Sequence, residues 1–335
     1  MCHGYPIVLR NELQDNNRHP GARSVTRRVA LLSGGVGGAR LARGFEHLEG
    51  VESTVVVNVG DDDTFYGWSV SPDLDTVLYT LAGQEGTAGW GRAGDTMVLM
   101  DHLASFGVDT RFRIGDADAA LNLYRTLRLR DGDPLHAITA DLAGMMGVES
   151  TIIPATDDRL RTEVLTGPGR WTAFQEYFVL RGHRDDVAEV RFVGEATARP
   201  APGVVEAIAD ADAVVIAPSN PPLSVWPILA VREIAAAVRG ARRVMAVSPL
   251  FGGRALKGPA DRVLTSLGLP PGNAGVAAAY PGLIQDFFID SADRADVPAL
   301  TRSGLSVHAG PTRIAEVEQA VGLARRMIGL LGLDS

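Results

Sequence analysis

The sequence is poor in cysteine, in long apolar runs and in positive charge. Cys2 is the single cysteine among 335 residues, which argues against internal disulfides and thiolate metal sites. The apolar stretch from Pro6 to Leu9 is too short for a secretion signal, and no run approaches the ~18 residues of a membrane span. A net charge of −8 argues against a nucleic-acid partner. These absences predict a cytoplasmic enzyme with neither a membrane nor a nucleic acid as partner.

What the sequence has in quantity is glycine and apolar residues in an alternating order. It contains 38 glycines and is 46% hydrophobic, which is enough to bury a substantial core. Apolar runs with little alternation, such as 29–32 and 54–57, are followed by segments with helical spacing, such as 39–48 and 74–83. This order predicts an α/β fold with a doubly wound, mostly parallel, Rossmann-like sheet.

Some segments depart from this simple order. Residues 1–27 read as a polar N-terminal extension ahead of one domain over 28–335. Residues 160–180 read as a hairpin around Gly-Pro-Gly, and with their neighbours they predict an inserted layer over about 130–200. Residues 111–116 read as a short strand. The C-terminal stretch 313–331 predicts a long helix with more apolar residues than one narrow stripe needs, so we expect a homodimer.

A glycine-rich turn follows the first predicted strand, at Gly34, Gly35, Gly37 and Gly38. Glycine lets another group approach the backbone closely, and a helix N-terminus offers N–H groups to an anion. The turn fits neither G-x-G-x-x-G, because Arg40 replaces the last glycine, nor the Walker loop. We expect a phosphate chain on these glycines, with a tight turn without ligand as the alternative.

Acidic residues gather after the second predicted strand. Five aspartates fall within residues 61–75: Asp61, Asp62, Asp63, Asp73 and Asp75. They repel one another and any phosphate unless a cation neutralises them, and Mg²⁺ takes one or two carboxylates together with phosphate oxygens and water. We expect Mg²⁺ on at least one of Asp61, Asp62 and Asp75, with a solvated turn and, for Asp73, helix capping as the alternatives.

The strand-end segments together resemble one known family. SGGVGGAR, VVVNVGDDD, SPDLDTVLYTL, IGDADAA, APSNPPLSVWPIL and DRAD occur in this order. The set resembles the CofD family, the 2-phospho-L-lactate transferases, called FbiA in actinobacteria, from about Arg28 to the C-terminus. The resemblance implies transfer of a phosphate-linked three-carbon acid from a guanosine diphosphate conjugate to the deazaflavin FO. GMP leaves, Mg²⁺ is required, and the product belongs to coenzyme F(420) biosynthesis; the acid stays open among lactate, enolpyruvate and glycerate.

The resemblance also implies a role for each matching residue. Asp75 and Asp62 are the catalytic carboxylates, Asp61, Asp62 and Asp75 the metal ligands, and Asp75 and Arg113 the contacts to FO. From the sequence alone, Arg113 also fits an ordinary exposed strand arginine. The donor nucleotide is expected to contact Gly34, Gly35, Gly37, Gly38, Arg40, Asn58, Ser219, Asn220, Pro221, Ser248 and Lys257.

Two other functions stay open at this point. One is a nucleotide-sugar-binding regulatory protein of the same fold, which would bind a UDP-sugar without turnover. The other is a Rossmann dehydrogenase, which the incomplete glycine pattern disfavours. The three clustered acids also disfavour it, because a ribose needs only one.

Overall fold

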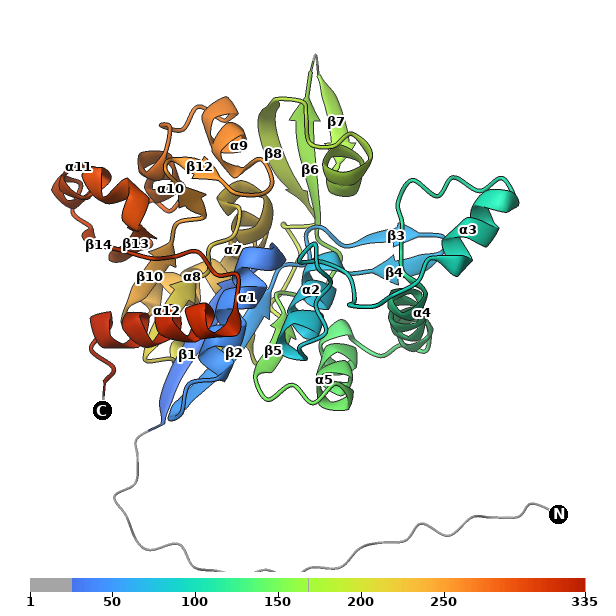
Figure 1. Ribbon diagram of the computed structural model, residues 1–335, viewed down its shortest axis with the longest axis horizontal. Coiled ribbons are helices and arrows are strands. Elements are labelled where there is room, and N and C mark those ends of the chain that lie inside the picture. Colours follow the sequence, from blue (N-terminus) through green and yellow to red (C-terminus); the bar gives the residue numbers. More distant parts are fainter. Residues whose placement is uncertain (1–25, 168, 335) are drawn as a thin grey trace, which may run out of the picture.

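The fold is organised around one parallel sheet. The computed structural model describes residues 26–334 except Pro168, so the predicted N-terminal extension, with Cys2, falls almost wholly outside the described residues. The seven-stranded main sheet has the order β14-β13-β10-β9-β1-β2-β5, and all its pairs are parallel (Figure 1). Its strands are β1 (Arg27–Ser33), β2 (Val51–Val57), β5 (Thr151–Pro154), β9 (Ala213–Ile216), β10 (Val244–Val247), β13 (Asp286–Asp290) and β14 (Ser306–Gly310).

This strand order confirms the doubly wound prediction. From β1 the chain adds β2 and β5 on one side, then returns to add β9, β10, β13 and β14 on the other. The order therefore reverses between β1 and β9, and in such sheets ligands bind in the crevice at this reversal, outside the carboxyl ends of the strands. The segments that follow β1, β2 and β9 carry most of the predicted site residues.

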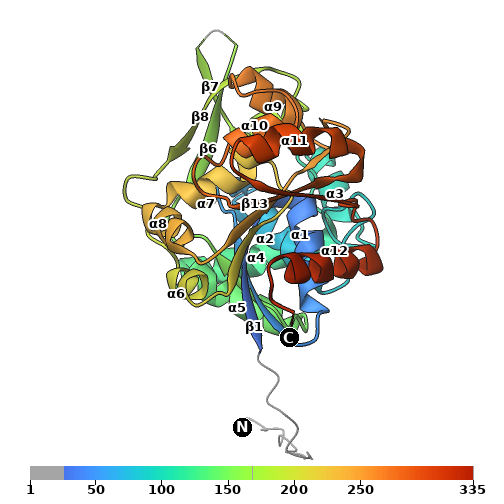
Figure 2. The ribbon, with the colours of Figure 1, turned by 90° about the vertical axis from the view of Figure 1, so that its left-hand side faces the viewer.

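Helices cover both faces of the sheet, which explains why its strands are apolar without alternation. Figure 2 shows α1 (Gly35–Glu46) and α12 (Val317–Leu330) on one face, with α6 (Val204–Ala209) and α8 (Arg232–Gly240) on the other. The helix α2 (Pro72–Leu81) packs against α1. Every residue of β9 and β10 is buried as a result.

The C-terminal helix forms as predicted, but its apolar face is used inside the chain. Its buried residues pack against α1, where a Cβ at Gly44 would overlap the backbone of Ala320. The apolar surplus that suggested a dimer is thereby explained by packing, so this helix no longer supports that expectation. Its buried residues are Ala320, Leu323, Ala324, Met327 and Ile328.

Two smaller units project from the main sheet. One is the antiparallel sheet β7-β6-β8, which contains the predicted hairpin: β6 (Arg161–Thr166), β7 (Arg170–Ala173) and β8 (Val187–Val193). The other joins a hairpin to two helices: β3 (Asp63–Phe65), β4 (Trp68–Val70), α3 (Val98–Ser105) and α4 (Asp116–Arg130). Because β5 belongs to the main sheet, the antiparallel layer begins after Pro154 rather than near residue 130.

The predicted strand over 111–116 is wrong. The segment stays irregular because it packs by side chains: the Phe112 ring stacks on Phe65 at 3.6 Å between centroids, and the Phe112 carbonyl accepts a hydrogen bond from Tyr66. The described elements not yet named are α5 (Leu135–Met145), η1 (Glu176–Leu180), η2 (Pro221–Val225), α7 (Trp226–Ala230), β11 (Leu250–Phe251), β12 (Arg254–Ala255), α9 (Ala260–Ser266), α10 (Asn273–Ala278), η3 (Ser291–Asp296) and α11 (Val297–Arg302).

In the described part of the chain, no single helix is long and apolar enough to cross a membrane. The pair Pro221–Ala230 and Arg232–Gly240 meets the length and composition criteria only when both are taken together, across a 96° bend. Its apolar side chains, among them Val225, Ile228 and Ile234, lie in the main core.

Candidate active site

The glycine turn joins β1 to α1 at the strand-order reversal. A Cβ at Gly37 would overlap the Pro218 carbonyl, and one at Gly38 would overlap the hydroxyls of Ser33 and Ser219. The protein's own packing therefore already requires these glycines, whatever binds to them. The turn still offers donors to a ligand: among the described residues, nothing accepts a hydrogen bond from the backbone N–H of Val36 or Gly37.

Asp73 lies directly against this turn. Its Oδ1 accepts a hydrogen bond from Gly35 N at 2.7 Å, and its Oδ2 accepts one from Asn58 Nδ2 at 2.9 Å. The same Asn58 amide donates to Asp61 Oδ1 at 3.2 Å, while its carbonyl accepts from Gly60 N. One asparagine thus links the glycine turn to the aspartates that follow β2.

Asp61, Asp62 and Asp73 form a buried group that we call the acidic cluster. They are 4%, 7% and 8% exposed, and no described arginine, lysine or histidine forms an ion pair with any of them. Burial raises the pKa of Asp62 to about 7 and that of Asp73 to about 6. Burial, followed by the charges of Asp73 and Asp62, raises the pKa of Asp61 well above its ordinary value. The raised pKa values mean that these carboxylates tend to hold protons near neutral pH, and a bound cation would stabilise their ionised forms instead.

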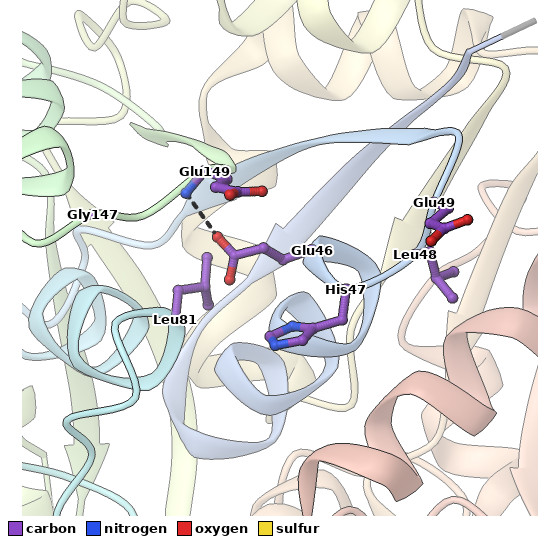
Figure 3. Close-up of a pocket in the computed structure, with 7 residues that line it drawn as sticks. All are labelled: Glu46, His47, Leu48, Glu49, Leu81, Gly147 and Glu149. Atoms are coloured by element: carbon purple, nitrogen blue, oxygen red, sulfur yellow. Dashed lines mark hydrogen bonds between the residues drawn. The ribbon is translucent and has the colours of Figure 1, made fainter.

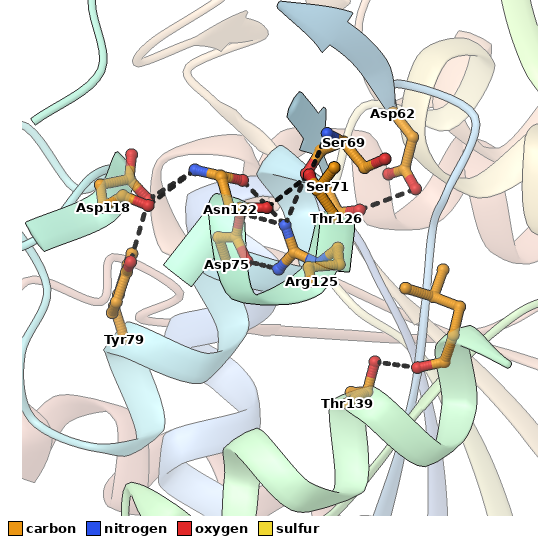
Figure 4. A network of polar contacts seen from close by, with 11 residues as sticks. Asp62, Ser69, Ser71, Asp75, Tyr79, Asp118, Asn122, Arg125, Thr126 and Thr139 are labelled. Carbon is orange, nitrogen blue, oxygen red and sulfur yellow. Dashed lines mark hydrogen bonds and ion pairs between the residues drawn. The ribbon is translucent and has the colours of Figure 1, made fainter. Parts of the chain in front are cut away.

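Asp75 is neutralised from within the protein, as Figure 4 shows. Arg125 NH1 donates to Asp75 Oδ2 at 3.2 Å, and Arg125 NH2 donates to Asp75 Oδ1. Burial raises the pKa of Asp75, and the Arg125 guanidinium opposes that rise. We call Asp75 and Arg125 the buried ion pair. Both carboxylate oxygens of Asp75 are engaged, unlike Asp62 Oδ1, which is buried without a partner among the described residues.

The two groups of carboxylates are close neighbours. Ser71 Oγ donates to Asp62 Oδ2 at 2.8 Å, and the Ser71 carbonyl accepts from Asp75 N at 2.9 Å. Asp73 and Asp75 stand two positions apart at the start of α2, so their side chains diverge by about 200° around the helix. One reaches the glycine turn and the other reaches α4.

Further predicted site residues end at the same edge of the sheet. Ser219 Oγ donates to the Gly34 carbonyl at 2.6 Å and accepts from Gly34 N. Asn220 Oδ1 is buried without a partner among the described residues, as is Ser33 Oγ. Pro221, at the start of η2, is also buried. A buried polar atom left unpaired costs about 1–3 kcal/mol, so several at one edge suggest that a ligand completes their bonding.

Four predicted site residues form hydrogen bonds or ion pairs with other residues of the protein. Arg40 pairs with Glu85 at 2.6 Å, and Arg113 pairs with Asp101 at 2.7 Å. The other two are Ser248, which donates to Asn273 Oδ1 at 2.6 Å, and Lys257, which donates to the Ala88 carbonyl at 2.9 Å. Their predicted ligand contacts stay predictions, and each would require these bonds to rearrange or to be shared.

A cavity of about 450 Å³ lies away from this edge, at the opposite end of α1 (Figure 3). Its walls include Glu46, His47, Leu81 and Glu149, and the Glu46 carboxylate already accepts a hydrogen bond from Glu149 N at 3.0 Å. No predicted site residue lines it, so we do not assign the active site to this cavity.

The fold and the site define a class: a doubly wound α/β protein with a glycine turn and buried carboxylates at the strand-order reversal. Residues 29–304 match the family described as 2-phospho-L-lactate transferase CofD, so the chain belongs to the CofD family.

Similar proteins carry related names. The chain is 39% identical over 312 residues to the "Phosphoenolpyruvate transferase" of Kitasatospora aureofaciens, covering 90% of this chain and 97% of that one. It is 38% identical over 309 residues to the "2-phospho-L-lactate transferase" of Methanopyrus kandleri, covering 91% and 97%. A crystal structure of a UPF0052 family member from Bacillus halodurans shares the fold, with a TM-score of 0.63 at 17% identity, covering 90% and 99% of the two chains.

Two residues of this site were not predicted from the sequence. The sequence analysis offers only helix capping for Asp73, although its place in SPDLDT puts it beside Asp75. Arg125 carries no local signal, because it is one of several arginines in α4 and lies 50 residues from its partner. Only the packing of α4 against α2 and β4 reveals its role.

Proposed function

We propose that this chain transfers a phospho-three-carbon-acid group from a guanosine diphosphate conjugate to FO, which releases GMP and forms coenzyme F(420)-0 or its dehydro form. The observation that carries the proposal is the set of polar groups at the strand-order reversal that have no hydrogen-bond partner within the described part of the chain. These are the N–H groups of Val36 and Gly37, Asp62 Oδ1 and Asn220 Oδ1. The family and the names of the relatives support this reaction class.

The chain's own residues would divide the task. The N–H groups at the start of α1 would bind the diphosphate, as helix N-termini do. Asn220 Oδ1 would accept a hydrogen bond from the guanine. Asp75 would accept a hydrogen bond from the attacking ribityl hydroxyl, because an ionised carboxylate has about four acceptor sites and Arg125 uses only two. Such a transfer depends mainly on positioning and charge neutralisation.

The donor atoms present fit Mg²⁺ held partly by the substrate. Within residues 26–334, excluding Pro168, no three metal-binding side chains are assembled into a ready site. Mg²⁺ commonly uses one or two carboxylates together with substrate phosphate oxygens and water. Asp61 and Asp62 would hold it, because Asp62 Oδ1 has no hydrogen-bond partner among the residues that the structure describes. When bound, the ion would neutralise phosphate charge and orient the reacting group.

The decisive experiment offers the purified protein FO, Mg²⁺ and one guanylated donor at a time: phospholactate, phosphoenolpyruvate or phosphoglycerate. We expect a mass increase of FO equal to the phospho-acid group, with equimolar GMP and no reaction in EDTA. One donor should react faster than the other two, and a competition among all three identifies it. Binding of a UDP-sugar, with no turnover of any donor, would instead favour the regulatory function.

We further propose a homodimer in the cytoplasm. Support for the dimer comes from exposed apolar side chains of α3, α4 and the segment between them. These include Val98 at 56%, Phe106 at 76% and Leu127 at 49% exposure. Light scattering at micromolar concentration checks the dimer, and fractionation of cells checks the compartment. A Phe106→Asp variant should be monomeric if this surface is the interface.

A further inference from the structure

Arg125 is the largest of the fully buried side chains in the described chain. It is 1% exposed, whereas Arg130, on the same helix, faces solvent. Burial alone would lower the pKa of Arg125, but the Asp75 carboxylate more than compensates and raises it. The guanidinium is therefore a fixed positive charge inside the protein, within reach of the candidate site.

The guanidinium is held on several sides. Besides its two bonds to Asp75, Arg125 NH1 donates to Asn122 Oδ1 at 2.8 Å and to the Ser69 carbonyl at 3.3 Å. Ser69 N in turn donates a hydrogen bond to Thr126 Oγ1 of α4 at 2.8 Å. These contacts join α4, β4 and α2 at one point (Figure 4). A planar guanidinium paired with both carboxylate oxygens fixes the orientation of that carboxylate as well as its charge.

The buried ion pair also affects the charge of the neighbouring acidic cluster. Asp62 lies close to the pair, because Ser71 bonds to both sides: its Oγ donates to Asp62 Oδ2 at 2.8 Å, and its carbonyl accepts from Asp75 N at 2.9 Å. Without Arg125, Asp75 would be a further uncompensated carboxylate beside the acidic cluster. A cation entering the site would then find an additional ligand there, and the position of the metal would be less defined.

We propose that Arg125 is a positioning residue that fixes the Asp75 carboxylate on the acceptor side of the site and keeps it from binding the metal. The acceptor side rests on the proposed function; the effect on metal binding does not. Arg125 thus separates the carboxylates into one that orients the attacking hydroxyl and others that remain available to the cation.

The first test measures steady-state kinetics with FO and the reactive donor. Arg125→Met should raise the KM for FO or lower kcat by at least tenfold, with the KM for the donor changed less than twofold. Combining it with Asp75→Asn should cost little beyond the larger single loss, because the two residues act as one unit. Arg130→Met is the matched control and should behave as wild type. Near-normal kinetics of Arg125→Met, or losses that multiply, would overturn the proposal.

The second test needs no turnover. Calorimetry with Mn²⁺ alone should give similar affinities for wild type and Asp75→Asn. It should give at least tenfold weaker binding for Asp62→Asn, and binding at least threefold tighter than wild type for Arg125→Met, which frees Asp75. If Asp75→Asn weakens Mn²⁺ binding as much as Asp62→Asn, Asp75 is a metal ligand and the proposal is wrong.

A third variant keeps the proposal testable if Arg125→Met fails to fold. Arg125→Lys keeps the charge but not the two parallel bonds. This variant should bind Mn²⁺ with wild-type affinity and should show a smaller loss in kcat or in the KM for FO than Arg125→Met does. A purely structural role would instead leave the kinetic constants for FO and the Mn²⁺ affinity of the folded fraction unchanged. If wild type turns over none of the three donors, the proposed reaction fails, and the Mn²⁺ series still decides whether Arg125 controls the carboxylates.

Discussion

The acidic cluster and the buried ion pair contain equally buried carboxylates in one site, but their negative charges are compensated by different kinds of partner. Asp61, Asp62 and Asp73 receive hydrogen bonds from neutral groups, among them Asn58 and Ser71, whereas Asp75 is paired with a guanidinium. A buried charge paired within the protein belongs to the architecture. One left unbalanced has a raised pKa and can be stabilised by something bound. The predictions below test this difference, from the largest expected effect to the smallest.

Removing the cation of the buried ion pair should have the largest effect on stability. Arg125→Met leaves a buried carboxylate uncompensated, which typically costs about 3–5 kcal/mol of unfolding free energy. Urea denaturation at pH 7.5 measures this loss. The double variant Arg125→Met with Asp75→Leu should recover most of it, because neither charge then remains. If the double variant is no more stable than the single one, packing rather than charge explains the loss.

Neutralising Asp62 should spare stability and remove activity. Asn can still accept the hydrogen bond from Ser71 Oγ, so the melting temperature of metal-free Asp62→Asn should equal or exceed that of wild type. Turnover with FO, Mg²⁺ and donor should fall about 10²–10³-fold, the usual loss when a group that stabilises transition-state charge is removed. The neighbouring Asp63→Asn is the control, because Asp63 is less buried and bonds to its own neighbour, Thr64 N. Equal activities of the two variants would contradict the assignment of the metal to Asp62.

The metal-free protein should lose stability as the pH rises. The folded-state pKa values of Asp62 and Asp73, about 7 and about 6, exceed those of an unfolded aspartate, so the folded state binds more protons in this range. The unfolding free energy should therefore fall by about 4 kcal/mol between pH 5 and pH 8. Denaturation curves in EDTA test the sign and the size. In Asp62→Asn the unfolding free energy should depend less on pH. An unfolding free energy of the wild type that increases over this range would contradict the raised pKa values of these carboxylates.

Asp73→Asn should have the smallest effect, which is a tighter binding of GDP rather than a weaker one. Asp73 places a negative charge beside the N–H groups that we assign to the diphosphate. Without metal, its removal should tighten GDP binding by about 1 kcal/mol, or roughly fivefold. With Mg²⁺ present the gain should shrink, because the cation already offsets this charge. Isothermal titration with GDP measures both values, and weaker binding without metal would mean that Asp73 helps to form the phosphate site.

The comparison also separates what local sequence patterns could predict from what they could not. The apolar runs of β1 and β2 predicted a parallel sheet, because strands covered by helices on both faces must be apolar throughout. The same patterns correctly predicted α1, α2, α12 and the β6–β7 hairpin. They failed at residues 111–116, where side-chain stacking on Phe65 replaces strand pairing.

For the site, the sequence by itself determined which segments meet, since the carboxyl ends of parallel strands share one edge and the motif order identifies the family. Only the tertiary structure decided how each charge is balanced. Asp73 and Asp75 look alike in SPDLDT, but their angular separation on α2 directs one to the glycine turn and the other to Arg125. A pairing across 50 residues depends on how α4 docks, and docking is set by the packing of whole faces rather than by any local motif.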